Sequence, residues 1–244
     1  SAKTKRSRAN PEDIPLAYRS HPGSRGSNPP TPRFLSLVGW ACIILLAIGS
    51  GLLLGPLRSR WSRPPLPNVS AQVSADGRLL GHFPYPEASR SSLRAVAPGL
   101  ELRDEAAQSF LAMQQAAAAD GVSLVVLSAF RSLEDQKELF FAVKAERNQT
   151  ALDRARVSAP PGFSEHSTGF ALDLGDLSQP QTNLSPTFAQ TKAYQWLTAH
   201  AARYQFTLSF PRNNAQGVNF EPWHWRYEGS VEALRLFEPA QRLA

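Results

Sequence analysis

The apolar and polar positions divide the chain into a polar arm, one long apolar run and a region of short periodic segments. Residues 1–33 are rich in Arg, Ser and Pro and have too few large apolar residues to build a core, so we expect a disordered tail. Residues 34–54 (FLSLVGWACIILLAIGSGLLL) carry no charge. As a helix at about 1.5 Å per residue this run spans about 30 Å, the thickness of a bilayer core, and is a transmembrane candidate.

Periodic segments in the second half predict helices and short strands in an irregular order. Apolar positions at helical spacing predict a helix over 101–120, and Ser132 with Asp135 three residues later indicates the start of another over 132–147. Ser185 followed by Pro186 is typical of the start of a third helix, which we expect over 185–204. The further expected elements are a helix over 230–237 and strands at 122–128, 169–174, 206–210 and 222–227.

This order predicts an α+β fold rather than a wound parallel sheet. We expect a small mixed or antiparallel sheet with flanking helices, preceded by one N-terminal transmembrane helix. The Pro-rich segment 55–80 is predicted to be a linker, and 81–244 the folded domain.

Positive charge is concentrated around the apolar run. The first 63 residues carry ten Lys or Arg against two acids, whereas the rest of the chain carries sixteen against eighteen. The basic flank predicts a cytoplasmic N-terminus and a single-pass protein of the inner or plasma membrane, with the folded domain on the extracytoplasmic, periplasmic side. A cleaved signal peptide is the alternative, but the arm is long for one and no clear cleavage site follows the run. The slightly acidic folded part argues against nucleic-acid binding, despite a pI near 9.8.

Two segments hold histidines beside other potential metal ligands. They are SEHSTGFALDLGD at 164–176 and EPWHWRY at 221–227. The chain's one cysteine, Cys42, lies in the apolar run, so ligands in the exported domain must be His and carboxylate. A catalytic zinc ion takes three such protein ligands and leaves a position for water, so we predict His166, Asp173 and His224 as ligands. Glu221 would then be free to accept a proton from a zinc-activated water as general base.

These residues resemble a known family. Ser164-x-His166-x-x-Gly169-x-Ala171-x-Asp173, followed by Glu221-x-x-His224-Trp225, is similar to the D-alanyl-D-alanine carboxypeptidase family of zinc peptidases, which includes the vancomycin-resistance carboxypeptidases and dipeptidases. The likeness covers about residues 101–227.

The resemblance implies a bacterial enzyme with one zinc ion per chain on the sheet, which hydrolyses the terminal D-alanine amide bond of peptidoglycan stem peptides. It implies zinc binding by the three predicted ligands and general-base catalysis by Glu221. It also implies that Arg131 polarises the scissile carbonyl and that Gln136 and Ser164 contact substrate. Phe130 departs from the family, where Tyr is frequent, which leaves open whether the enzyme is D,D- or L,D-specific.

Several residues also have ordinary structural interpretations. Arg131 could instead form a salt bridge with Glu134 or Asp135. Trp223 and Trp225, two apart on a strand, would share the face opposite His224 and belong to the core. The remaining interpretations are that His21, His82 and His200 are ordinary surface or core histidines, that Asp176 caps a turn, and that Arg226 packs its stem and pairs with a nearby acid.

Two other functions stay open at this point. One is a catalytically inactive peptidoglycan-binding protein that retains the zinc site, although such a module has no need of Glu221 and Arg131. The other is a zinc peptidase that acts on an ordinary protein or on a cross-bridge.

Overall fold

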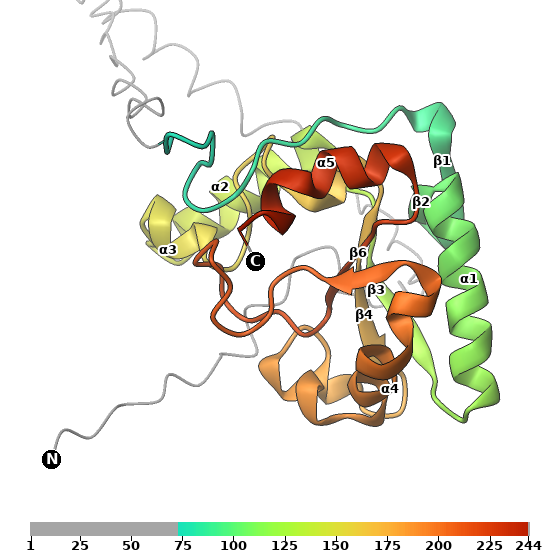
Figure 1. Ribbon diagram of the computed structural model, residues 1–244. Coiled ribbons are helices and arrows are strands. Elements are labelled where there is room, and N and C mark those ends of the chain that lie inside the picture. Colours follow the sequence, from blue (N-terminus) through green and yellow to red (C-terminus); the bar gives the residue numbers. More distant parts are fainter. Residues whose placement is uncertain (1–72, 244) are drawn as a thin grey trace, which may run out of the picture. The chain divides into compact units, whose positions relative to one another are not determined.

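A computed structural model describes residues 73–243 (Figure 1). The strands are β1 (Leu93–Ala97), β2 (Leu100–Arg103), β3 (Leu124–Ser128), β4 (Ala171–Asp176), β5 (Phe206–Leu208) and β6 (His224–Tyr227). The α-helices are α1 (Asp104–Ala119), α2 (Leu133–Glu146), α3 (Ala151–Ala155), α4 (Lys192–His200) and α5 (Val231–Gln241). Short 3-10 helices are η4 (Arg90–Ser92), η5 (Glu165–Thr168), η6 (Pro180–Thr182), η7 (Pro186–Gln190) and η8 (Ala201–Tyr204).

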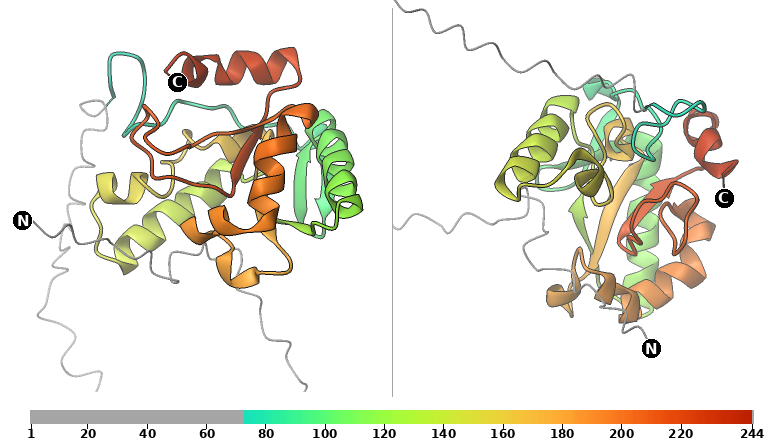
Figure 2. Two further views of the ribbon diagram at one scale, coloured as in Figure 1. Left: turned by 60° about the horizontal axis from the view of Figure 1, so that its bottom comes forward. Right: turned by 90° about the vertical axis from the view of Figure 1, so that its left-hand side faces the viewer.

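The central feature is a four-stranded sheet in the order β3-β4-β6-β5, in which every pairing is antiparallel. Figure 2 shows α2 and α3 on one side of this sheet and α4 on the other. Side chains alternate between the two faces of a strand. Leu172 and Leu174 of β4, with Trp225 and Tyr227 of β6, belong to the main hydrophobic core. Asp173 and His224 therefore point to the opposite face.

The predicted α+β class and antiparallel sheet are confirmed, but the first helix begins later than predicted. Residues Glu101 to Arg103 belong to β2, which pairs with β1 from Leu93↔Arg103 to Ala97↔Leu100. Leu102 is fully buried in this hairpin, so its apolar character served strand packing rather than a helical face. The helix α1 then starts at Asp104.

The predicted helix over 185–204 is also wrong in its extent, because the structure divides it into η7, α4 and η8. Thr191 has extended backbone angles and starts α4 as its N-cap, with its hydroxyl accepting from Tyr194 N. Ser185 caps η7 by accepting from Thr187 N. Two capping residues within one apolar pattern therefore start two short helices.

The other predicted elements are present with shifted ends. The predicted Ser132 N-cap of α2 is confirmed, since its hydroxyl accepts from Asp135 N. Helix α5 continues beyond the predicted end at Phe237 and includes Pro239. Helix α3, which the sequence pattern did not predict, begins with a capping box between Thr150 and Asp153.

The predicted tail, apolar run and most of the linker lie outside the described residues. Between residues 73 and 243 no helix has both the length and the apolar character that a membrane crossing requires. Residues 73–80, at the end of the predicted linker, form a turn in which Val73 and Leu79 pair as an antiparallel bridge.

Candidate active site

Three neighbouring strands place buried polar side chains in one row across the face of the sheet opposite the main hydrophobic core. Asp173 on β4 is the direct partner of His224 on β6 and, on its other side, of Ser128 on β3. The register of β3 shifts between Val126 and Ser128 just before this row. Antiparallel pairing therefore brings together two predicted ligands that lie far apart in the chain.

The third predicted ligand, His166, reaches the row from η5. This short helix ends at Gly169, whose φ of 71° is left-handed. A Cβ at Gly169 would also lie 3.0 Å from carbons of Arg103 and Leu93. Glycine is thus needed both for the turn and for the close approach that carries the chain from His166 into β4.

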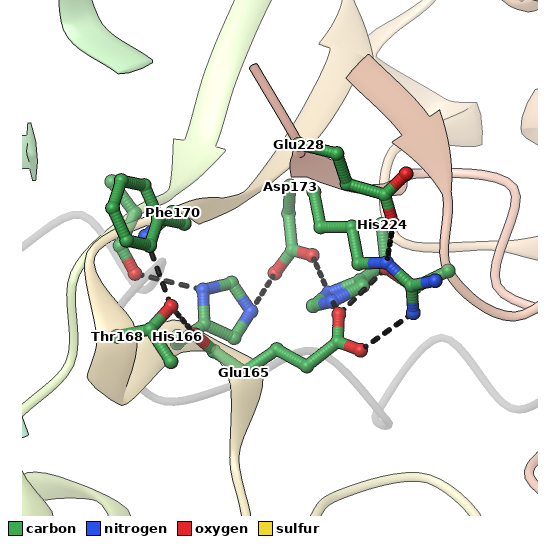
Figure 3. A network of polar contacts seen from close by, with 10 residues as sticks. Glu165, His166, Thr168, Phe170, Asp173, His224 and Glu228 are labelled. Carbon is green, nitrogen blue, oxygen red and sulfur yellow. Dashed lines mark hydrogen bonds and ion pairs between the residues drawn. The ribbon is translucent and has the colours of Figure 1, made fainter. Parts of the chain in front are cut away.

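The three side chains converge in a buried group (Figure 3). His166 Nε2 lies 3.3 Å from Asp173 Oδ2, and His224 Nδ1 lies 3.0 Å from Asp173 Oδ1. One ligand atom from each residue lies within 4.8 Å of those from the other two. Among the described residues, this is the one group of three such side chains close enough to hold a metal ion.

Each imidazole is oriented through its second nitrogen. His166 Nδ1 donates to the carbonyl oxygen of Ala129 at 2.8 Å, and His224 Nε2 lies 2.9 Å from Glu165 Oε2. His166 Nε2 and His224 Nδ1 are therefore the nitrogens directed at Asp173. Two imidazoles and one carboxylate, with each imidazole fixed from behind, are a donor set that suits zinc.

The charges of this group depend strongly on one another. Burial alone would raise the pKa of Asp173, but His166 and His224 lower it overall. Burial alone would lower the pKa of His224, but hydrogen bonds to Asp173 and Glu165 raise it to about 10. The pKa of His166 is lowered, chiefly by burial. Asp173 is thus held as an ionised carboxylate between the two imidazoles.

Glu165, which the sequence analysis did not select, is the centre of the supporting network. It accepts from Ser209 Oγ at 2.6 Å and from Arg226 Nη1 at 3.1 Å, in addition to its contact with His224. Arg226 also pairs with Glu228 at 2.6 Å, in agreement with the interpretation that it pairs with a nearby acid. Burial raises the pKa of Glu165, yet Arg226 and His224 outweigh it and bring the value to about 2. Its place beside His166 was the only sequence signal.

A cavity of about 620 Å³ opens beside the three predicted ligands. Its lining includes His166, Asp173 and His224 together with the predicted Glu221 and Ser164. The structure therefore brings these five of the seven predicted site residues to one cavity. Its apolar lining includes Leu139 of α2 and, from the loop preceding β6, Phe220 and Trp223.

Glu221 is a buried carboxyl on this cavity wall. Its backbone is fixed because Glu221 N donates to Phe210 O at 3.1 Å and His224 N donates to Glu221 O at 3.1 Å. Burial first, and then the nearby charges of Asp173 and Glu165, raise the pKa of Glu221 to about 8. Such a carboxyl changes its protonation near neutral pH, as a proton-transfer group must.

Arg131 lines the cavity and is held by neutral partners. Its guanidinium donates to Gln136 Oε1 at 2.8 Å and to Ser128 Oγ at 2.7 Å, rather than to Glu134 or Asp135. Within residues 73–243, Arg131 therefore forms no salt bridge with an acidic side chain. Gln136 is fully buried and does not line the cavity, since its amide also donates to Ala159 O at 2.6 Å. Gln136 thus contacts Arg131 from behind.

The aromatic residues near the site differ from the expected arrangement. Trp225 is buried in the core, as predicted. Trp223 precedes β6, so strand alternation does not apply to it, and it packs partly on the core while lining the cavity beside His224. Phe130 lies beneath the guanidinium of Arg90 at 4.9 Å and is not a cavity residue.

The remaining residues with ordinary interpretations lie as follows. His82 is buried, lines the cavity and donates from Nε2 to Ala155 O at 2.7 Å. His200 stacks on Trp196 with ring centroids 4.8 Å apart. Asp176 accepts from Ser178 N at 2.8 Å and so closes a turn, as predicted. His21 lies outside the described residues.

Comparison with known proteins agrees with this geometry. Residues 99–230 match the family model of VanY, described as D-alanyl-D-alanine carboxypeptidase. A D-alanyl-D-alanine carboxypeptidase of Enterococcus faecalis (strain ATCC 700802 / V583) is 31% identical over 131 residues, which are 50% of this chain and 46% of that protein. The chain thus spans about half the length of this curated relative.

Two solved structures share the fold. The LdcB LD-carboxypeptidase is 29% identical with a TM-score of 0.51, over 66% of this chain and 72% of that chain. VanYB in complex with D-alanine-D-alanine is 27% identical with a TM-score of 0.51, over 66% of this chain and 90% of that chain.

Proposed function

Since the chain belongs to the VanY family of D-alanyl-D-alanine carboxypeptidases, we propose that it removes the terminal D-alanine from peptidoglycan stem peptides. The observation that carries this proposal is the convergence of His166, Asp173 and His224 beside Glu221 in one cavity. A peptide-binding module that does no chemistry has no use for a buried carboxyl with a pKa of about 8.

The donor set fits one zinc ion per chain, held by His166, Asp173 and His224. When bound, zinc supplies a Lewis acid that polarises a carbonyl and increases the acidity of water. Glu221 accepts the proton of the attacking water and passes it to the leaving amine. Arg131, fixed by Gln136 and Ser128, donates to the oxygen on which negative charge develops. In this arrangement Ser164 offers a hydroxyl to the substrate from the cavity wall.

We propose the bond between two D-alanines as the preferred target, because the matching family model and the Enterococcus faecalis relative are both described as D-alanyl-D-alanine carboxypeptidases. The similar structure LdcB is instead named an LD-carboxypeptidase. The two substrates differ in the residue before the scissile bond, so one experiment separates them.

The test incubates the purified, zinc-loaded full chain with two peptides and follows their masses. One is a stem pentapeptide that ends in D-Ala-D-Ala, and the other a stem tetrapeptide that ends in one D-Ala. Release of alanine from the pentapeptide, abolished by a chelator and by Glu221→Ala, is the expected result. Release from the tetrapeptide alone would make the protein an L,D-enzyme. No release from either, with zinc bound, would refute the proposed reaction and favour the inactive peptidoglycan-binding protein.

We also propose that the domain acts outside the cytoplasm, anchored by residues 34–54. The support is the uncharged run with its basic flank, both in the sequence outside the described residues. Fractionation of cells, followed by protease treatment of spheroplasts, tests this. Full-length protein in the membrane fraction that loses its domain to external protease is the expected outcome, and protein in the cytosolic fraction would contradict it.

A further inference from the structure

Arg154, in α3, is a buried cation that the surrounding residues leave without a partner. It is 4% exposed, and its Nε has no hydrogen-bond partner. Across residues 73–243 no side-chain hydrogen bond or ion pair reaches its guanidinium. Arg226, which is equally buried, pairs with Glu165 and Glu228. Because a buried charge is costly unless it is paired, an unpaired one indicates a missing partner.

The guanidinium of Arg154 belongs to the same cavity as the candidate catalytic residues. Arg154 lines this cavity together with Glu221, Arg131 and His166. Burial, and then the nearby charges of Arg147 and Arg131, lower its pKa to about 10, so Arg154 remains a cation at neutral pH. An anionic group that enters the cavity would meet this charge.

The backbone around Arg154 is fixed from two sides. His82 Nε2 donates to Ala155 O at 2.7 Å, and Asn219 N donates to Arg156 O at 3.0 Å. The carbonyls on either side of the α3 terminus are thus tied to segments distant in the chain. A cation held in this way is preorganised for a ligand.

Resting on the function proposed above, we propose that Arg154 binds the free α-carboxylate of the substrate's C-terminal residue. A carboxypeptidase has to distinguish the end of a peptide from an internal amide, and the terminal carboxylate is the group that differs. The planar guanidinium of arginine binds a carboxylate through two parallel hydrogen bonds. A site that leaves this arginine unpaired rejects a peptide that lacks the carboxylate.

Arg212 is the matched comparison, since it also lines the cavity. It is exposed, and its guanidinium lies over the Phe220 ring at 4.1 Å. An exposed arginine is solvated by water and loses little when no carboxylate is present. It therefore lacks the unpaired burial that identifies Arg154.

The first experiment measures kcat/KM of the zinc-loaded full chain on a pentapeptide ending in D-Ala-D-Ala and on the same peptide with a C-terminal carboxamide. Wild type should prefer the free acid by about 100-fold or more. Arg154→Gln should lose about 100-fold on the acid and almost nothing on the amide, whereas Arg154→Lys should lose less. Arg212→Gln should retain the preference for the acid. Equal losses of Arg154→Gln on both peptides, or loss of the preference in Arg212→Gln instead, would overturn the assignment.

A second experiment measures binding without turnover. Two zinc-loaded proteins, the Glu221→Ala variant and the double variant Glu221→Ala/Arg154→Gln, are titrated by calorimetry with D-Ala-D-Ala and with its amide. Binding of the acid alone, dependent on Arg154, supports the carboxylate site even if the wild type cleaves nothing, an outcome that would refute only the proposed reaction. Cleavage by the wild type together with equal binding of the acid and the amide would support the proposed reaction but overturn the carboxylate site at Arg154. If circular dichroism shows that Arg154→Gln does not fold, the preference for the acid over the amide is compared between Arg154→Lys and the wild type instead.

Discussion

Behind each imidazole of the site stands a residue that determines which nitrogen faces Asp173. For His166 it is the backbone carbonyl of Ala129, which no substitution removes, and for His224 it is the side chain of Glu165. A carboxylate behind a metal-binding histidine fixes its ring and increases its basicity. Glu165 is thus a positioning residue.

Replacement of Glu165 by Gln tests this role. The substitution keeps the shape but removes the negative charge, so zinc affinity should fall by about 10-fold to 100-fold. Competition with a chromophoric chelator measures it. Glu228→Gln is the matched control, because Glu228 pairs with the same Arg226 but does not contact His224. Equal zinc affinities in the Glu165→Gln and wild-type proteins would contradict the role.

Arg131 makes a second prediction at this scale. Arg131→Lys keeps the charge but cannot donate to Gln136 and Ser128 in the same fork, so the cation loses its orientation. We expect kcat to fall by about 100-fold to 1,000-fold, with zinc content unchanged. Steady-state kinetics and metal analysis provide both readouts. A loss of zinc together with activity would indicate a structural role instead.

That His166, Asp173, His224 and Glu221 share one site could be predicted from the sequence, because they lie in two short segments with characteristic spacing. Glu165 and Arg154 could not, although both are buried and charged. The roles of these two residues depend on side chains that are distant in the sequence. Arg226 pairs with Glu165, whereas Arg154 has no side-chain partner among residues 73–243. The sequence pattern does not show whether such a partner is present.

At the scale of elements, α3 shows how a short helix can place one side chain. Its five residues are held by the capping box of Thr150 and Asp153, in which Thr150 Oγ1 accepts from Asp153 N at 3.1 Å. Thr150→Ala should lower the free energy of unfolding by about 1 kcal/mol, measured by urea denaturation. Thr198→Ala, at an exposed position within α4, removes a hydroxyl that caps nothing and should change stability by less than about 0.5 kcal/mol.

The helices α2 and α5 could be predicted because a capping residue, Ser132 or Ser230, precedes a segment with helical apolar spacing. Elements could not be predicted correctly where tertiary contacts outweighed the local sequence pattern. Leu102 fits a helical apolar face, yet pairing with β1 makes it part of a strand. Thr191 lies within a continuous helical pattern, yet its fully buried hydroxyl donates to Phe188 O at 2.8 Å and accepts from Tyr194 N, which interrupts the helix.

Across residues 73–243 as a whole, the raised pKa values predict how stability varies with pH. In the folded protein the pKa of Glu221 is about 8 and that of His224 is about 10, whereas their ordinary pKa values, 4.5 and 6.5, apply in the unfolded chain. Both groups therefore keep their protons in the folded state at pH values at which the unfolded chain has lost them. Metal-free protein should therefore lose stability as pH rises through 4.5 to 8 for Glu221 and 6.5 to 10 for His224. Glu165, with a pKa of about 2, has the opposite effect, and its contribution is lost as pH falls from about 4.5.

Melting temperatures of metal-free and zinc-loaded protein near pH 6 and pH 9 measure this. The metal-free protein should melt at a lower temperature at pH 9, and Glu221→Gln should reduce the difference. Zinc competes with the proton on His224, so the increase in melting temperature that zinc causes should be larger at pH 9. A metal-free protein equally stable at both values would refute the protonated state of these two groups.

The pairing of Asp173 with His224 also determines when the protein can acquire its metal. The two residues are 51 positions apart, so the site closes only after a long chain segment has folded back and β6 has joined β4 in register. A nascent chain that has reached β4 offers two ligands and holds zinc weakly. We therefore expect zinc uptake to be a late event in folding, and a fluorescent zinc indicator in a refolding experiment would time the formation of the β4–β6 ladder.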